Sequence, residues 1–362
     1  MAELSPDASL TQDESFTATN HKGLTYPLGD HAPAVGEVTR VSEGVNWARI
    51  PMPGSLGHIN SWLLDEGEDG VAIVDTGMLL TMCSDAWKAL FDKGLAGKRI
   101  TRVICTHLHP DHIGLAGWLC KKFGVELWMT RGEWLTARML TVDARDEPPE
   151  AFAVLQRASG WNEAEIAQSL AKGWGRFGKM VFAMPVSYRR LQHGDVLDLG
   201  GNQWRVVVGS GHSPEHACLV NDAAGVMISG DQVLPRISSN VSVNITEPEA
   251  DPLGEWLDSI DRLLDLPGHL LVCPAHGEPF HGLHTRLAAL RDEHLERLDT
   301  VAASLVEPKR AVDCFAMLFN RPIGEHNREL ATGEAQAHLR RLERDGRARR
   351  EVVDGVHWYH PA

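Results

Sequence analysis

The stretch Thr106-His107-Leu108-His109-Pro110-Asp111-His112 decides the fold of this chain. It places three histidines and an aspartate within six residues, directly after the apolar run 102–105. Imidazole and carboxylate groups are the side chains that bind zinc and similar divalent metals. Because side chains alternate along an extended segment, the first two histidines face the same side, and the proline then turns the chain. The stretch can therefore offer two ligands to one metal and two to its neighbour. A surface loop that merely happens to be rich in histidine is the weaker interpretation.

Bulk properties favour a two-domain enzyme. The chain has 362 residues and a formal net charge of −14, which argues against a nucleic acid or an anionic membrane as partner of the whole molecule. The start of the chain has no basic segment followed by an apolar one, and no apolar run approaches the roughly 20 residues that span a bilayer. Six scattered cysteines without a C-x-x-C pair are typical of a reduced protein. We therefore expect a cytoplasmic protein.

Hydrophobic periodicity predicts an α/β layered domain. Residues 1–36 lack periodicity and are expected to form an extension, extended or partly disordered, with regular structure beginning at Glu37. Short apolar runs then alternate with helical spacing up to about residue 282. Within this domain, residues 131–182 form a largely helical insert that is rich in tryptophan and phenylalanine. These aromatic residues either pack the insert against the main domain or line an apolar substrate pocket over the metals.

Further candidate ligands stand at the ends of other strands. Asp75, His212, Asp231 and His276 each follow an apolar strand and lie next to or near a glycine. Strand ends in an α/β sheet meet at a common edge, so these residues can reach the histidine-rich stretch. Each alone has a structural interpretation, such as a helix cap for Asp75. Four together favour a metal site.

This ordered set resembles the metallo-β-lactamase fold hydrolases, which include glyoxalase II-like thioesterases, lactonases, β-lactamases and RNA-processing nucleases. The resemblance covers residues 37–282 and rests on five motifs. They are Val74-Asp75-Thr76-Gly77, the H-x-H-x-D-H run at 107–112, Gly211-His212, Gly230-Asp231 and Ala275-His276-Gly277. The resemblance implies a four-layer αββα sandwich with the metals at one edge.

The resemblance also implies a dinuclear site with an assigned ligand set. The first metal would be bound by His107, His109 and His212, and the second by Asp111, His112 and His276, with Asp231 bridging. Zinc is the first expectation, while iron and manganese stay open. A shared hydroxide would be the nucleophile, held in line by Asp111 or Asp231.

Other residues are expected to support the site or to contact the substrate. Asp75 would orient the ligand loop, and His216 is expected to be a supporting residue rather than a ligand. In the loop 57–60, His58 and Asn60 are candidate substrate contacts, with a turn role as the alternative. Arg236 is a candidate contact for an anionic substrate.

Residues 283–362 resemble a small winged-helix domain that follows this fold in a subgroup of hydrolases. We expect three helices and then a hairpin at an Asp-Gly turn, with six arginines on the last helix and hairpin. Reading DNA is one use of such a domain. Packing, dimerisation into a homodimer or closing of the pocket fits the acidic chain better.

Three functions follow in order of preference. The first is a dinuclear metal-dependent hydrolase of a small-molecule ester, thioester or lactone. The second is a nuclease of the same fold that cleaves RNA or another phosphodiester, and the third is a nucleic-acid-binding regulator that uses the winged helix. Substrate identity is not encoded in any motif of the chain.

Overall fold

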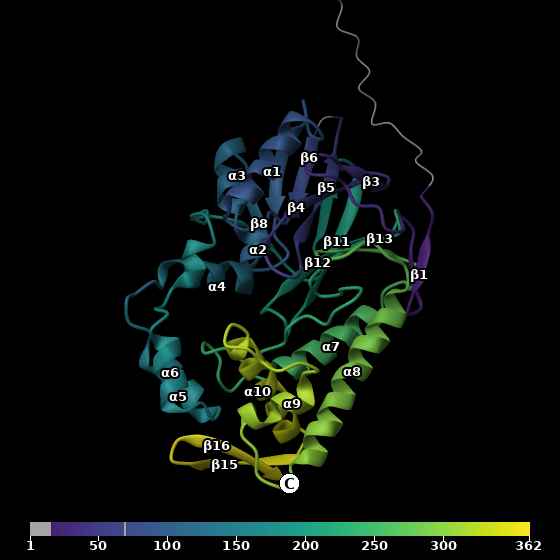
Figure 1. The fold of residues 1–362 in the computed structure, drawn as a ribbon. Coiled ribbons are helices and arrows are strands. Elements are labelled where there is room, and N and C mark those ends of the chain that lie inside the picture. Colours follow the sequence, from purple (N-terminus) through teal and green to yellow (C-terminus); the bar gives the residue numbers. More distant parts are fainter. Residues whose placement is uncertain (1–15, 69) are drawn as a thin grey trace, which may run out of the picture.

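Two mixed β-sheets packed face to face form the centre of the molecule (Figure 1). This computed structural model describes residues 16–68 and 70–362. The first sheet has the strand order β3-β4-β5-β6-β7-β8-β9, antiparallel up to β6 and parallel from there on. Its strands are β3 Thr39–Ser42, β4 Val45–Pro51, β5 His58–Glu66, β6 Gly70–Val74, β7 Arg99–Ile104, β8 Leu127–Thr130 and β9 Arg189–Leu191.

The second sheet has the order β10-β11-β12-β13-β14 and is antiparallel except for its last pair. Parallel neighbours need a crossover connection, and helix α7 (Pro252–Leu264) supplies it between β13 and β14. The strands are β10 Val196–Leu199, β11 Asn202–Gly209, β12 His216–Asn221, β13 Val226–Gly230 and β14 Leu271–Pro274.

Three hydrophobic interfaces hold four layers together, so the predicted αββα sandwich is confirmed. Strand β6 shows the principle, because its side chains alternate between two cores. Val71 and Ile73 pack under the helices α1 (Thr81–Asp92) and α3 (Ala116–Phe123), whereas Ala72 and Val74 pack between the sheets. On the outer face of the second sheet lies α7, together with α8 (Leu283–Ser304).

The N-terminal segment differs from the expectation. Regular structure does not begin at Glu37, because β1 (Thr19–His21) and β2 (Leu24–Tyr26) form a hairpin. Leu24 and Tyr26 are buried against the core under the second sheet, and the backbone of Thr25 pairs with that of His281. This pairing partner lies far away in the sequence, which explains why no local pattern revealed the hairpin. The first 15 residues of the predicted extension lie outside the described part of the chain.

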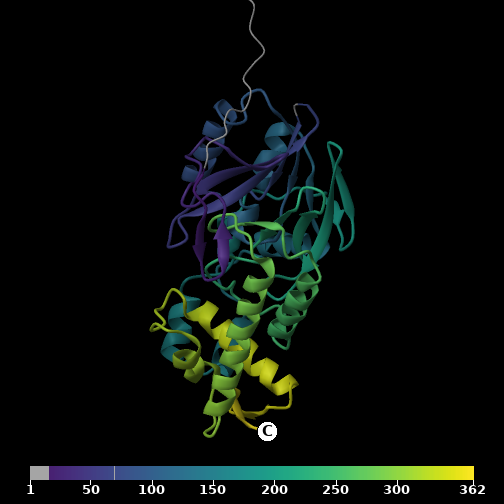
Figure 2. The same cartoon turned by 90° about the vertical axis from the view of Figure 1, so that its right-hand side faces the viewer.

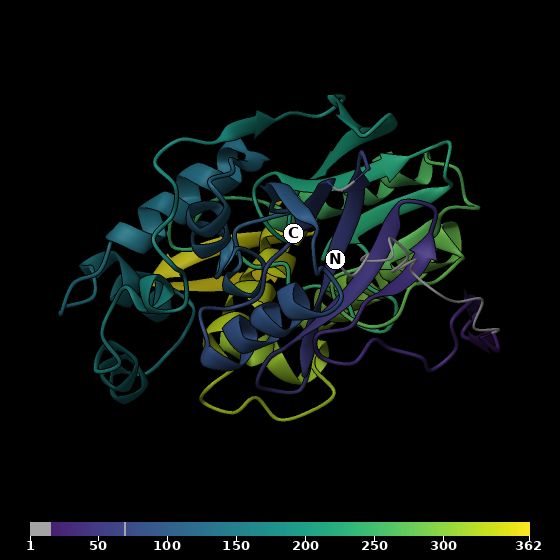
Figure 3. The ribbon, with the colours of Figure 1, turned by 90° about the horizontal axis from the view of Figure 1, so that it is seen from above.

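The insert is helical as predicted, and it projects to one side of the sandwich (Figure 3). Its elements are α4 (Arg131–Val142), α5 (Glu150–Ala158), α6 (Glu163–Leu170) and a 3₁₀ turn at Arg176–Lys179. Trp134 and Phe177 pack against the main domain, whereas Trp161 donates a hydrogen bond of 3.0 Å to Thr332 near the C-terminus. The insert thus bridges two parts of the chain.

The C-terminal region lies below the sandwich and packs on it through α7 and α8 (Figure 2). After α8 follow a 3₁₀ turn and α9 (Phe315–Leu318), then α10 (Arg328–Arg344) and the hairpin β15 (Ala348–Val353) and β16 (Val356–Pro361). Helices followed by a hairpin at Asp354-Gly355 match the predicted order. Its identity as a winged helix, and the boundary at residue 283, stay predictions. None of the helices in the described part of the chain combines the length and apolar character that a bilayer crossing demands.

Candidate metal centre

The seven predicted ligands meet at one edge of the sandwich. They stand on the loop and short helix α2 (Pro110–Ile113) after β7, and directly after β11, β13 and β14. Strands β11, β13 and β14 run in the same direction, so their C-terminal ends share this edge. Two groups form, one of His107, His109, His212 and Asp231, the other of Asp111, His112 and His276.

Three imidazole nitrogens converge in the first group. His107 Nε2 lies 2.9 Å from His109 Nδ1 and 3.2 Å from His212 Nε2, and the last two nitrogens lie 3.0 Å apart. Ligands at zinc–nitrogen distances of 2.0–2.1 Å in tetrahedral geometry are separated by about 3.3 Å. Burial lowers the pKa of His107 well below its ordinary value and that of His109 to about 3, and neutral imidazole is the form that binds a metal. The spacing therefore fits a metal ion.

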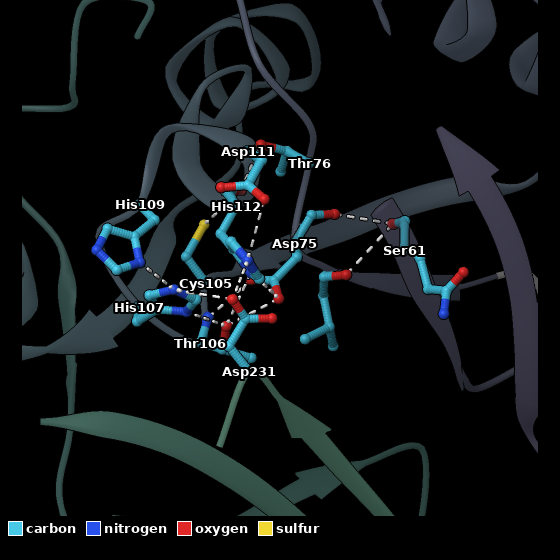
Figure 4. A network of polar contacts seen from close by, with 12 residues as sticks. Ser61, Asp75, Thr76, Cys105, Thr106, His107, His109, Asp111, His112 and Asp231 are labelled. Atoms are coloured by element: carbon cyan, nitrogen blue, oxygen red, sulfur yellow. Dashed lines mark hydrogen bonds and ion pairs between the residues drawn. The ribbon is translucent and has the colours of Figure 1, made fainter. Parts of the chain in front are cut away.

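The second group combines histidines with carboxylates. His276 Nε2 lies 3.2 Å from Asp111 Oδ2, and His112 Nε2 lies 3.6 Å from the same oxygen. Asp231 stands between the groups, since Oδ2 is 3.5 Å from His112 Nε2 and 3.5 Å from His212 Nε2 (Figure 4 shows Asp231 beside His107 and His112). This is the position that a bridging carboxylate requires.

Buried polar atoms without hydrogen bonds supply an independent test of fit. His112 Nε2, His276 Nε2 and Asp231 Oδ1 are buried and have no hydrogen-bond partner among the described residues. Such orphaned groups cost about 1–3 kcal/mol each. All three belong to the predicted ligand set, so bound metal ions would satisfy the atoms that the protein leaves unsatisfied.

The opposite nitrogen of each buried ligand is fixed by the protein. His212 Nδ1 lies 2.7 Å from the carbonyl oxygen of Asn240, and His276 Nδ1 lies 2.8 Å from that of His58. A ligand histidine that donates its other N–H is held in one tautomer and orientation. These two carbonyl groups were not predictable, because a backbone oxygen carries no residue-specific signal.

Asp75 organises the histidine-rich loop as predicted. Its φ of +62° is the left-handed region that aspartate tolerates better than most residues. The carboxylate accepts hydrogen bonds from the backbone N–H and the hydroxyl of Thr106, each at 2.8 Å, and lies 2.8 Å from His112 Nδ1 (Figure 4). Burial opposes the charged form of His112, but Asp75 and the other carboxylates outweigh it and raise the pKa.

A further buried acid, Glu133 at the start of α4, holds both ligand loops together. Its carboxylate accepts hydrogen bonds from Leu108 N at 2.8 Å, Ser213 Oγ at 2.6 Å and Glu215 N at 2.7 Å. Leu108 lies between two ligands and Ser213 follows a third. Burial raises the pKa of Glu133 to about 7 despite these donors. Sequence reasoning missed this residue because nothing local distinguishes it from a surface glutamate.

His216 supports the bridging aspartate. The ring is fully buried, stacks on His107 at 4.8 Å between centroids and accepts a hydrogen bond of 3.1 Å from Asp231 N. Gly230 leaves room for it, since a Cβ there would lie 2.5 Å from His216 Nε2. This geometry is that of a supporting residue.

The three candidate substrate contacts have different surroundings. Asn60 is fully buried, so the prediction that it contacts the substrate is wrong. Its side-chain oxygen accepts a hydrogen bond from Trp47 Nε1, and its side-chain nitrogen donates to the carbonyl groups of Pro274 and Gly277. Asn60 thereby positions the loop that carries His276. His58 is half-buried beside His276, and burial lowers its pKa to about 4. Arg236 is half-exposed and pairs with Glu278. For both His58 and Arg236, substrate contact stays a prediction.

The fold and the paired donor sets define a metallohydrolase of the αββα class. Comparison with known proteins assigns the family: residues 54–276 match the metallo-β-lactamase superfamily, and residues 298–362 match the metallo-β-lactamase-like C-terminal domain. The chain therefore belongs to the metallo-β-lactamase superfamily.

Among solved structures, a β-lactamase domain protein from Burkholderia ambifaria shares 40% identity, with a TM-score of 0.83 over 94% of this chain and 100% of that one. A probable metallo-hydrolase, YqjP of Bacillus subtilis, is 25% identical over 83% of this chain and 93% of its own length. Two further relatives have thioesterase names. The first is the atrochrysone carboxyl ACP thioesterase of Aspergillus terreus, which is 22% identical over 78% of this chain and 69% of its own length. The second is the acyl-coenzyme A thioesterase MBLAC2 of Homo sapiens, which is 25% identical over 53% of this chain and 64% of its own length.

Proposed function

We propose that this metal-dependent hydrolase carries two zinc ions and cleaves a small-molecule thioester. The observation that carries the proposal is the pair of donor sets that share Asp231, because a shared carboxylate suits two neighbouring cations. The choice of a thioester over an ester or lactone is supported by the two relatives named as thioesterases of acyl carrier protein and acyl-coenzyme A substrates.

Two bound divalent metals would supply hydroxide near neutral pH and an electrophile for the substrate carbonyl group. The residues of the chain have separate tasks around that chemistry. Asp111, whose side chain is 17% exposed, is the more accessible of the two central carboxylates and can accept a hydrogen bond from an attacking water. The water-derived oxygen forms a C–O bond with the carbonyl carbon, the C–S bond breaks, and the products are a carboxylate and a thiolate. The thiolate needs little acid assistance to leave because thiol pKa values lie near 8.5.

The arginines of the C-terminal region support a small-molecule substrate over a nucleic acid. Four of the six arginines predicted to form a basic patch pair with carboxylates. Arg340 and Arg350 both contact Glu249, Arg341 contacts Asp251, and Arg347 contacts Asp299. Charges neutralised in this way contribute little to phosphate binding.

The test is a hydrolysis screen of the purified protein against acyl-coenzyme A thioesters, aryl esters, lactones, β-lactams and phosphodiesters. We expect thiol release from acyl-coenzyme A to exceed every other rate, and His109→Ala to lower it by about 1,000-fold or more. His21→Ala, on the exposed hairpin, is the matched control and should be silent. Wild-type turnover by His109→Ala with full metal content, or a phosphodiester as the preferred substrate, would end the proposal.

A further inference from the structure

A groove runs between the helical insert and α10. It consists of two adjoining cavities of about 250 Å³ each, which together reach the size of a small-molecule site. Phe152 and Glu329 line both cavities, so the two lie next to each other. In Figure 1, α5 and α6 lie on one side of this region and α10 on the other. We call these two cavities together the groove.

The walls of the groove expose more apolar than polar surface, and the charged residues Lys172, Arg176 and Glu329 also line it. Trp161 and Val243 are buried there, and the rings of Phe152 and Trp174 lie 5.3 Å apart between centroids. One polar atom stands out. Gln156 is 4% exposed, and while Nε2 donates to Ser169 Oγ, Oε1 has no partner among the described residues. A mainly apolar surface with several polar groups, one of them a buried unsatisfied acceptor, is typical of a ligand site.

Two elements connect the groove to the metal centre. The first is the loop after Asp231: the carbonyl group of Asn240 contacts His212, and Ser242, two residues on, lines the groove. Two residues span at most about 7 Å. The second is α4, on which Glu133 contacts the ligand loop and Leu140 lines the groove, about 10 Å further along the helix at 1.5 Å per residue. The walls of the groove therefore lie within about 7–10 Å along the chain of residues that contact the ligand loops, a separation that a medium acyl chain can span.

We propose that the groove binds the acyl group of the substrate and sets its length preference. This inference rests on the proposed thioesterase function and adds the part of the substrate that the metals do not contact. Each buried methylene group contributes about fourfold to binding. Activity should therefore rise steeply from acetyl to octanoyl and dodecanoyl thioesters.

The test changes the volume of the groove without touching the metal centre. Leu330 is 55% exposed at the rim, so Leu330→Trp should fold normally and fill the groove, and Phe152→Ala should enlarge it. Val154, on the same helix as Phe152, is 51% exposed and lines neither cavity, so Val154→Trp is the matched control.

We expect Leu330→Trp to lower kcat/KM for dodecanoyl-coenzyme A by tenfold or more, with acetyl-coenzyme A changed by less than about twofold. Phe152→Ala should shift the preference toward longer chains, and Val154→Trp should leave the profile intact. An unchanged length profile in both groove variants would overturn the inference while leaving the thioesterase proposal standing.

A binding measurement separates the two proposals further. Titration of dodecanoate into the metal-loaded protein by calorimetry needs no turnover. Binding that Leu330→Trp weakens by tenfold supports the groove even if no thioester is cleaved, in which case the thioesterase proposal fails alone. Absence of binding, or equal binding in both proteins, overturns the groove.

Discussion

The metal edge and the groove are built in opposite ways. At the metal edge, the ligands come from the sandwich itself and are largely buried, and several are held by a second hydrogen bond, as His112 is by Asp75. The groove is formed mainly by the insert and the C-terminal region, with residues 242–245 of the sandwich, and several of its walls are half-exposed, as Phe152 is. The difference supports our proposal that separate parts of this chain carry out bond cleavage and substrate selection. Substitutions at the edge should abolish function, whereas substitutions in the groove should redirect it.

The largest effect should come from replacing Asp75, which supports the ligands at the metal edge. Asp75→Ala removes the acceptor of three hydrogen bonds and frees the ring of His112, so we expect metal affinity to fall by about 100-fold. Competition with a chromophoric chelator measures it. The control is Asp65→Ala, at the end of β5 away from the metal edge, because among the described residues its carboxylate bonds Asn46 alone. An affinity equal to wild type would refute the supporting role of Asp75.

The packing of α8 against α10 should make the stability of the protein depend on pH. His294 and His338 are fully buried between α8 and α10, with ring centroids 5.6 Å apart. Burial, together with Arg297 and, for His294, the neighbouring His338, lowers their pKa values to about 3 and about 4. Below the unfolded pKa of about 6.5 the unfolded chain binds protons that the folded chain excludes, so stability falls as pH decreases toward 4.

Replacing one of these histidines should therefore make the unfolding free energy fall less steeply as the pH is lowered. We expect His338→Leu to reduce the loss of unfolding free energy between pH 7.5 and 4.5 by on the order of 2 kcal/mol. Urea unfolding of the metal-free protein at both pH values measures the loss, and His21→Leu serves as the exposed control. The same pH dependence in all three proteins would show that the buried pair is not responsible.

Glu133 tests the junction of the two regions, because it stands on the insert but bonds the ligand loops. Glu133→Gln replaces one acceptor oxygen by a donor and leaves a buried N–H of the loops unpaired, so we predict about tenfold weaker metal binding. Glu215→Gln is the matched control, since within residues 16–68 and 70–362 the Glu215 carboxylate bonds Gly132 N alone. If both variants bind metal equally well, the insert does not organise the centre.

The smallest effect concerns the contact between the insert and the C-terminal region. Trp161→Phe keeps a six-membered aromatic ring but loses the N–H that bonds Thr332 and part of the buried ring, which should cost about 1–2 kcal/mol in urea unfolding. Metal content should stay at the wild-type level, because neither residue reaches the ligands. A loss of metal from this variant would contradict the separation of edge and groove.

The sequence predicts the metal edge better than the groove for a physical reason. Asp75, His212, Asp231 and His276 each follow an apolar run, so the strand end that positions them is visible locally. Topology alone then brings such ends together. The supports of the ligands are different, because Glu133 and the carbonyl of Asn240 act across long sequence separations.

The sequence indicated the insert side of the groove but not the side formed by α10. The aromatic residues of the insert indicated either packing or a pocket, and the structure assigns Trp134 to the first and Trp161 to the second. Its opposite wall on α10 was hidden, because the approach of Leu330 depends on how the C-terminal region packs. Asn60 shows the converse error, since a polar residue beside a site looked like a substrate contact but is fully buried.

The number of metal ions bound per chain tests most directly whether the protein has a two-metal centre divided between two ligand groups. Elemental analysis of the zinc-reconstituted protein should give two metal equivalents per chain for the wild type. It should give about one for His109→Ala, in the first group, and about one for His276→Ala, in the second. One equivalent or none in the wild type, or two in His276→Ala, would contradict the account.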